Sequence, residues 1–139
     1  MAAIHALLGF TGWTLLLIAV VFLYRGVRTM KGTPINHWPR GEKPADLAPW
    51  VARLQDAHAN CIENLVPFAA IVLTAASLSK LYAIDAIAPW VLYARIAQTL
   101  VHLSGTGPTQ VMVRATLWLV QLVLFFWMLV LTFVPPHLT

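Results

Sequence analysis

Four long apolar stretches limit the folds that are open to this 139-residue chain. Each has roughly 20 residues, the length of helix that crosses a hydrocarbon core about 30 Å thick. They cover about residues 4–24, 60–78, 83–103 and 111–134. Backbone groups in lipid must be hydrogen-bonded within the protein, and the alternating pattern of a membrane barrel is missing. The sequence therefore predicts an all-α integral membrane protein, a four-helix bundle forming a single domain over residues 1–139.

Composition agrees with a membrane protein and argues against a nucleic-acid partner. Hydrophobic residues make up 60% of the chain and charged residues 10%, whereas soluble domains carry about 25% charged residues. The net charge of +4 comes largely from one loop, at about residues 25–52, as membrane topology requires. The single cysteine, Cys61, excludes an internal disulfide, and the five scattered histidines lack the spacing of a metal site.

The basic residues also predict the orientation of the chain. The N-terminal segment and the tail after Val134 contain no Lys or Arg. Six basic residues instead lie between the first and second apolar stretches: Arg25, Arg28, Lys31, Arg40, Lys43 and Arg53. The positive-inside rule places this loop in the cytoplasm and both termini on the other side. Asp46, near the end of the loop, is a candidate N-cap for a second helix that begins before the membrane.

The first apolar stretch could alternatively be a secretory signal. It lacks a positively charged segment before it and an A-x-A cleavage site after it. We therefore interpret it as a transmembrane helix.

A polar seam crosses the start of the second stretch, in the segment RLQDAHANCIENLVPF at residues 53–68. On a helix, its polar side chains fall within an arc of roughly 100°: they are Arg53, Asp56, Asn60, Glu63 and Asn64. A charge at the bilayer centre costs about 2.5–3.5 kcal/mol on insertion scales. We therefore expect Asn60 and Glu63 to face protein or a water-filled cavity, with an arginine beside Glu63, and the seam to favour self-association.

The third and fourth stretches carry polar groups that could meet this seam. On the third, one helical face presents Arg95, Gln98, Thr99 and His102. On the fourth, Arg114, Trp118 and Gln121 share a face. Arg25 and Arg28 lie at the same predicted membrane level, at the end of the first stretch. Such a cluster of cations could bind an anionic ligand whose tail reaches the bilayer.

Each of these groups also has a purely structural interpretation. Glu63 and Arg95 can form an ion pair without function. Asn60 can hydrogen-bond across helices, and Arg28 can serve only as a topology signal. Arg114 can extend to lipid headgroups.

The segment at residues 53–68 resembles the second-helix signature of the MAPEG family, the membrane-associated proteins in eicosanoid and glutathione metabolism. The matching residues are Ala57, His58, Asn60, Glu63, Pro67 and Phe68. The segment YARIAQTLVH is similar to the family's third-helix segment, with Arg95 matching. VRATLW is similar to the start of its fourth helix, with Arg114 matching.

This resemblance implies a homotrimer of four-helix bundles in a bacterial inner membrane, with the second helices around the central axis. It implies a transferase or peroxidase that conjugates or reduces lipophilic electrophiles with glutathione or another small thiol. Arg114 would lie near the thiol as the catalytic residue, and Arg95 would pair with Glu63. The thiol-binding residues would be Arg28, Asn60, Glu63, Arg95, Gln98 and His102.

The chain departs from the family pattern at positions that matter for glutathione. Ala59 stands where many members have Arg, and His102 where they often have Tyr. Ala115 and Trp118 replace a Ser and a Tyr of the fourth helix. A non-enzymatic membrane protein, either a small transporter or a structural partner, is therefore the alternative. An intramembrane carboxylate such as Glu63 would suit a transport path.

Overall fold

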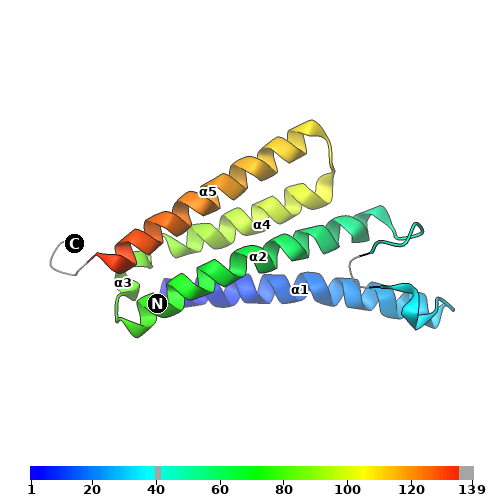
Figure 1. Cartoon of the computed structure of the whole chain (residues 1–139), viewed down its shortest axis with the longest axis horizontal. Coiled ribbons are helices and arrows are strands. Elements are labelled where there is room, and N and C mark those ends of the chain that lie inside the picture. The colour runs from blue at the N-terminus through cyan, green and yellow to red at the C-terminus, as the bar shows by residue number, and fades with distance from the viewer. Residues whose placement is uncertain (40–41, 135–139) are drawn as a thin grey trace.

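The computed structural model describes residues 1–39 and 42–134, and the regular elements among them are helices, with no β-strand (Figure 1). The helices are α1 (Ala2–Met30), the 3-10 helix η1 (Ile35–His37), α2 (Pro49–Ser77), α3 (Leu81–Ile84), α4 (Ala88–Ser104) and α5 (Pro108–Phe133). Within this part of the chain, α1, α2 and α5 are each long and apolar enough to cross a membrane. The prediction of an all-α membrane protein is confirmed at this level.

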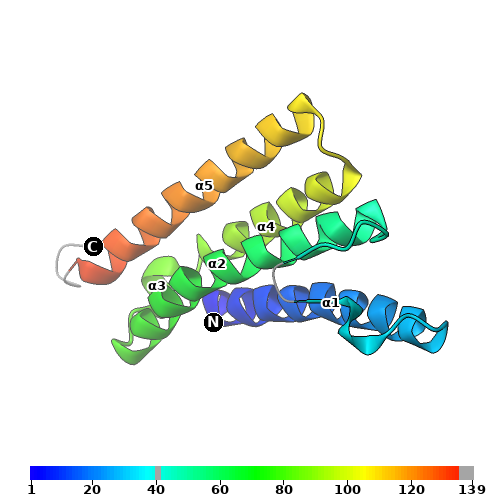
Figure 2. The same ribbon diagram turned by 45° about the vertical axis from the view of Figure 1, so that its right-hand side comes forward.

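Helix α2 runs antiparallel to α1, and α5 runs antiparallel to α4, so that α1 and α4 point one way and α2 and α5 the other (Figures 1 and 2). The loop between α1 and α2 and the turn between α4 and α5 lie at one end of the molecule, and the N-terminus, α3 and the end of α5 lie at the other. Helix α1 packs against α2 and α4, whereas α5 packs extensively on α4 and less on α2. The basic loop and the α4–α5 turn therefore share one end of the molecule. Arg40 and the tail after Val134 lie outside the described residues.

The observed helices differ in length from the predicted apolar stretches. Helix α1 continues to Met30, and α2 begins at Pro49, well before residue 60. Its N-cap is Ala48 and not Asp46, because the carboxylate of Asp46 is bound to other side chains of the loop. Proline suits this first helical position, where its missing N–H would have no partner.

The predicted third stretch is shortened by a turn. Residues 85–87 form this turn, and Oδ1 of Asp85 accepts a hydrogen bond of 2.8 Å from the backbone N–H of Ala3. Helix α4 therefore begins at Ala88, not at residue 83, and its 17 residues span about 26 Å at 1.5 Å per residue. This contact ties the start of α1 to the start of α4.

Aromatic rings join three helices at the centre of the molecule. Phe10 of α1 and Phe68 of α2 lie with their ring centroids 5.8 Å apart, and Phe125 of α5 stacks on Phe68 at 6.0 Å. Phe10 and Phe68 are fully buried. Aromatic pairs at such distances contribute about 0.5–1.5 kcal/mol beyond their burial. The three rings therefore fix the middle of α2 relative to α5.

Lys80 holds the far end of α5. Its Nζ donates hydrogen bonds of 2.8 and 2.9 Å to the carbonyl oxygens of Thr132 and Val134. The last carbonyls of a helix have no partner within the helix and carry partial negative charge, so a cation there is favourable. This contact anchors the end of α5 that is opposite to the α4–α5 turn.

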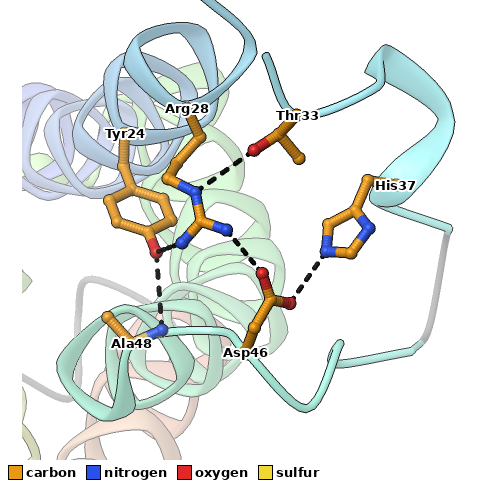
Figure 3. Close-up of polar contacts among 6 residues, drawn as sticks. All are labelled: Tyr24, Arg28, Thr33, His37, Asp46 and Ala48. Atoms are coloured by element: carbon orange, nitrogen blue, oxygen red, sulfur yellow. Dashed lines mark hydrogen bonds and ion pairs between the residues drawn. The ribbon is translucent and has the colours of Figure 1, made fainter. Parts of the chain in front are cut away.

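A polar cluster folds the basic loop back onto the end of α1 (Figure 3). Arg28 donates through Nη2 to Oδ2 of Asp46 at 2.5 Å, through Nε to Thr33 at 3.3 Å, and through Nη1 to the hydroxyl of Tyr24 at 3.3 Å. Nε2 of His37 lies 2.8 Å from the other carboxylate oxygen of Asp46. Asp46 therefore joins the loop before α2 to both η1 and α1.

We expect this loop to loosen in acid. The contacts with His37 and Arg28 hold the pKa of the Asp46 carboxyl below its usual range. A carboxyl whose folded pKa is lowered stabilises the fold above the ordinary aspartate pKa of about 3.9. That contribution is lost as the pH falls through the lowered pKa. Hydrogen exchange at residues 31–39, corrected for intrinsic rates, should therefore accelerate below about pH 4. In Asp46→Asn it should be fast already at neutral pH, and equal protection in both proteins would contradict the prediction.

Candidate functional site

A groove of about 360 Å³ lies between α2 and α5. Its walls are mostly apolar, with two polar side chains from α2 and a tryptophan from α5. The lining residues are Glu63, Asn64, Pro67, Ile71, Trp118, Leu122, Phe125, Phe126 and Leu129. Ligand sites commonly have this character, with apolar walls and few polar groups that fix orientation. We define these nine residues as the α2–α5 groove.

Glu63 and Asn64 supply the polar groups of the groove. Asn64 is buried, and its Nδ2 donates a hydrogen bond of 2.9 Å to the backbone carbonyl of Asn60. Glu63 is exposed, and within the described residues it forms no ion pair. The predicted pairing of Glu63 with Arg95 is therefore not formed within the single chain, since Glu63 lies on the outer side of α2 and Arg95 is buried.

Arg95 lies among the helices without a carboxylate. It is 1% exposed, and its Cζ lies 5.4 Å from the centre of the Phe10 ring. Its Nε and Nη2 are buried and have no hydrogen-bond partner in the described part of the chain. Thr99 donates to the backbone carbonyl of Arg95 at 3.0 Å and lies 3.8 Å from the sulfur of Cys61. The structure thus separates Arg95 from the α2–α5 groove.

Gln98 forms a clamp between α4 and α5. Its Oε1 accepts a hydrogen bond of 3.0 Å from Nε2 of Gln121, which is fully buried. Its Nε2 donates to the backbone carbonyl of Arg114 at 3.1 Å. Polar side chains that hydrogen-bond across helices are common in membrane proteins. Gln98 therefore holds the backbone that carries Arg114, and His102 is buried one turn further along α4.

Arg114 stands one helical turn before the groove. It is half-buried, and its Nε is buried with no partner among the described residues. Trp118, which lines the groove, follows four positions later on α5, so the two side chains share one helix face. Arg114 can therefore present its remaining N–H groups to an anion at this end of the groove.

The predicted site residues separate into three places. Asn60, Glu63 and Arg114 lie at or next to the α2–α5 groove. Arg95, Gln98 and His102 are buried among the helices. Arg28 is at the end of α1, where Asp46 neutralises its charge (Figure 3).

Sequence reasoning missed the apolar wall of the groove. Trp118, Leu122, Phe125 and Leu129 follow one another at helical spacing along one face of α5. This periodicity could have indicated a groove wall. In an apolar helix, however, the same periodicity is found on a face that packs against lipid. Only the position of α2 opposite this face makes it a groove.

A comparison with protein-family models identifies the family of this chain. A model described as the MAPEG family matches residues 3–134. The chain belongs to the MAPEG family. The curated proteins and the solved structures gave no match. The family match spans α1 to α5 and includes the groove, so the resemblance seen in the sequence is confirmed.

This MAPEG protein presents two of its departures from the family pattern on open surface. Ala59 is exposed on α2, and Ala115 is exposed on α5 next to Arg114. Within a single chain, side chains larger than alanine would therefore have room at both positions. Of the other two departures, Trp118 fills part of the groove wall and His102 is buried on α4.

Proposed function

We propose that this MAPEG protein is a thiol-dependent transferase or peroxidase that acts on lipophilic electrophiles, with glutathione or another small anionic thiol as its second substrate. The observation that supports this most is the apolar α2–α5 groove, which has Arg114 one turn from its Trp118 wall. An acceptor from the lipid would occupy the apolar part. The thiol would bind at the Arg114 end, where the guanidinium has an unpartnered N–H.

The proposed reaction requires the protein to stabilise a thiolate and to hold two reactants together. A free thiol has a pKa near 8.5, and a nearby cation lowers it. Arg114 would favour loss of the thiol proton to water, and the thiolate would then attack the electrophilic carbon. The new S–C bond forms as the leaving group departs with its electron pair. With a peroxide, attack on oxygen releases an alcohol and leaves a sulfenic acid, which a second thiol converts to disulfide and water. Holding both reactants together supplies much of the acceleration.

We further propose that each subunit spans the membrane four times and that three subunits assemble around α2. In a single chain, Glu63 would face lipid, where a charge is costly. The exposed residues of this face recur at helical spacing: Asp56, Ala59, Glu63, Val66 and Ala70. Copies of α2 packed along this face would remove Glu63 from lipid. Native mass spectrometry of the detergent-solubilised protein should show trimers, and a stable monomer would contradict this assembly.

Orientation in a bacterial inner membrane can be tested by cysteine labelling. In a Cys61→Ala background, Asn36→Cys marks the loop between α1 and α2, and Ser77→Cys marks the opposite end. We expect an impermeant maleimide to label Ser77→Cys in cells whose outer membrane is permeable, and Asn36→Cys only after lysis. The reason is the positive charge of the loop. The reverse pattern would overturn the predicted topology.

The proposed activity can be measured with an aryl chloride activated by nitro groups. Protein reconstituted into vesicles should release chloride in a thiol-dependent reaction. Filling the groove by Leu129→Trp should raise KM for the acceptor, because Leu129 is part of its wall, and should leave calorimetric thiol binding unchanged. Val130→Trp is the matched control, since Val130 is exposed and is not a lining residue.

Two results would contradict parts of this proposal. Absence of both turnover and thiol binding in the trimeric protein would favour the non-enzymatic alternative, a transporter or a structural partner. Equal effects of Leu129→Trp and Val130→Trp would place the acceptor outside the α2–α5 groove.

A further inference from the structure

A second cavity, of about 430 Å³, lies between the last turns of α1 and the η1 segment. It is separate from the α2–α5 groove and shares no lining residue with it. The residues on which its chemistry depends are Phe22, Arg25, Thr29, Met30, Ile35 and Trp38. We call it the α1 cavity.

Two N–H donors of the α1 cavity have no acceptor among residues 1–39 and 42–134. Nε of Arg25 and Nε1 of Trp38 are buried atoms, and neither has a hydrogen-bond partner in the described part of the chain. Buried donors without an acceptor are unfavourable and uncommon in folded proteins. Both residues line the same cavity, and Cζ of Arg25 lies 5.6 Å from the centre of the Trp38 ring. A ligand with acceptor oxygens would satisfy both donors together.

The cavity also holds a positive charge that no acidic residue in the described part of the chain pairs with. Arg28, one turn further along α1, is engaged by Asp46, Thr33 and Tyr24 (Figure 3). Arg25 has no ion pair among the described residues. The lining residues include no Asp or Glu. The cavity is therefore suited to an anion, and its lining has no carboxylate for the cationic group of a zwitterionic headgroup.

The remaining walls are apolar and open to the surroundings. Phe22, Met30 and Ile35 are 75%, 89% and 84% exposed. Phe22 belongs to the apolar part of α1, a candidate membrane span, and Trp38 lies beyond its end. Tryptophan is enriched where hydrocarbon meets water. The cavity thus combines an anion-binding end with apolar surface that leads toward the bilayer.

We propose that the α1 cavity binds the phosphate group of an anionic phospholipid. The phosphodiester oxygens accept hydrogen bonds from Nε of Arg25 and Nε1 of Trp38, and an acyl chain follows Phe22 along α1. A guanidinium and a phosphate form a charge-assisted pair, which is stronger than a neutral hydrogen bond.

The proposal is tested on the full-length protein in detergent by titration with dioleoylphosphatidylglycerol and with dioleoylphosphatidylcholine. Native mass spectrometry counts bound lipid, and thermal unfolding reports the stabilisation. We expect the anionic lipid to bind at least roughly tenfold more tightly than the zwitterionic one. Arg25→Gln should weaken it by roughly ten- to a hundredfold. Trp38→Phe, which keeps an aromatic ring and removes the N–H, should also weaken it.

Lys31→Gln is the matched control, since it removes the same charge from an exposed position next to the cavity. It should change lipid binding less than about twofold. Equal losses in Lys31→Gln and Arg25→Gln would show general surface electrostatics and overturn the proposal. Equal binding of the two lipids would also overturn the proposal.

Stabilisation by inorganic phosphate alone to the same extent would show an anion site without a lipid. Displacement of the lipid by glutathione would assign the cavity to the thiol. Arg25→Lys keeps the positive charge but loses the Nε donor. Partial lipid binding by this variant would show that the loss in Arg25→Gln comes from the removed contact and not from misfolding.

Discussion

Replacing Arg114 with methionine is expected to lower thiol-dependent conjugation by roughly a hundredfold or more, because the guanidinium that favours the thiolate is lost. Methionine keeps an unbranched apolar stem, although it is shorter than arginine, and it leaves the Gln98 clamp in place, since Gln98 binds the backbone of Arg114. The rate should also shift to higher pH, because the bound thiol regains its ordinary pKa near 8.5. The measurement is kcat/KM against pH, with thiol affinity from calorimetry.

Matched variants separate this role from general charge loss. Lys31→Met removes an exposed charge from a residue that does not line the α2–α5 groove, and it should leave the pH profile of kcat/KM unchanged. Ala59→Arg restores a residue that many family members have, at an exposed position, and is expected to strengthen glutathione binding. Conjugation that is indifferent to Arg114→Met would place the thiol elsewhere and refute the catalytic role of Arg114.

Replacing Arg95 with methionine is expected to stabilise the fold by about 1–4 kcal/mol, the range seen when buried ion pairs are replaced by well-packed apolar residues of similar volume. Arg95 is almost fully buried, and two of its guanidinium nitrogens have no partner in the described residues. Its contact with the Phe10 ring offsets only part of the cost of desolvation. Unfolding in mixed detergent micelles measures the difference in free energy.

Arg95→Lys is the control for this second prediction. It keeps a buried cation and should not stabilise the protein. A loss of stability in Arg95→Met, by about 3–5 kcal/mol, would show that Arg95 has a buried anionic partner in the assembled protein. In that case Glu63→Gln should cause a similar loss, because Glu63 is the carboxylate predicted from the sequence.

Much of the fold was determined by sequence. Apolar stretches of about 20 residues with few charges leave helices as the stable structure in a bilayer. The segment at residues 53–68 was enough to indicate the MAPEG family, which the match over residues 3–134 confirms. These features are local, since length, hydropathy and helical spacing depend only on neighbouring positions.

The contacts between helices were decided by tertiary structure alone. Helical spacing places Arg95 and Gln98 on one face of α4, but the rotation and depth of α4 turn that face toward Phe10 and Gln121. The same spacing groups Glu63 with Asn64, yet one is exposed and the other buried. The sequence alone could not predict which groups meet, because pairing across helices depends on how each helix is turned and shifted relative to its neighbours.

The contacts of the loop between α1 and α2 were likewise decided by the tertiary structure. Asp46 has the residue type of an N-cap, and its position before α2 fits that role. The fold instead brings it to Arg28 and His37, two charged or polar groups from earlier in the chain (Figure 3). Arg28 is thereby neutralised while Arg25 is left without an ion pair among the described residues. The two arginines look alike in sequence, and only the return of the loop onto α1 distinguishes them, because a carboxylate can neutralise only the cation that it reaches.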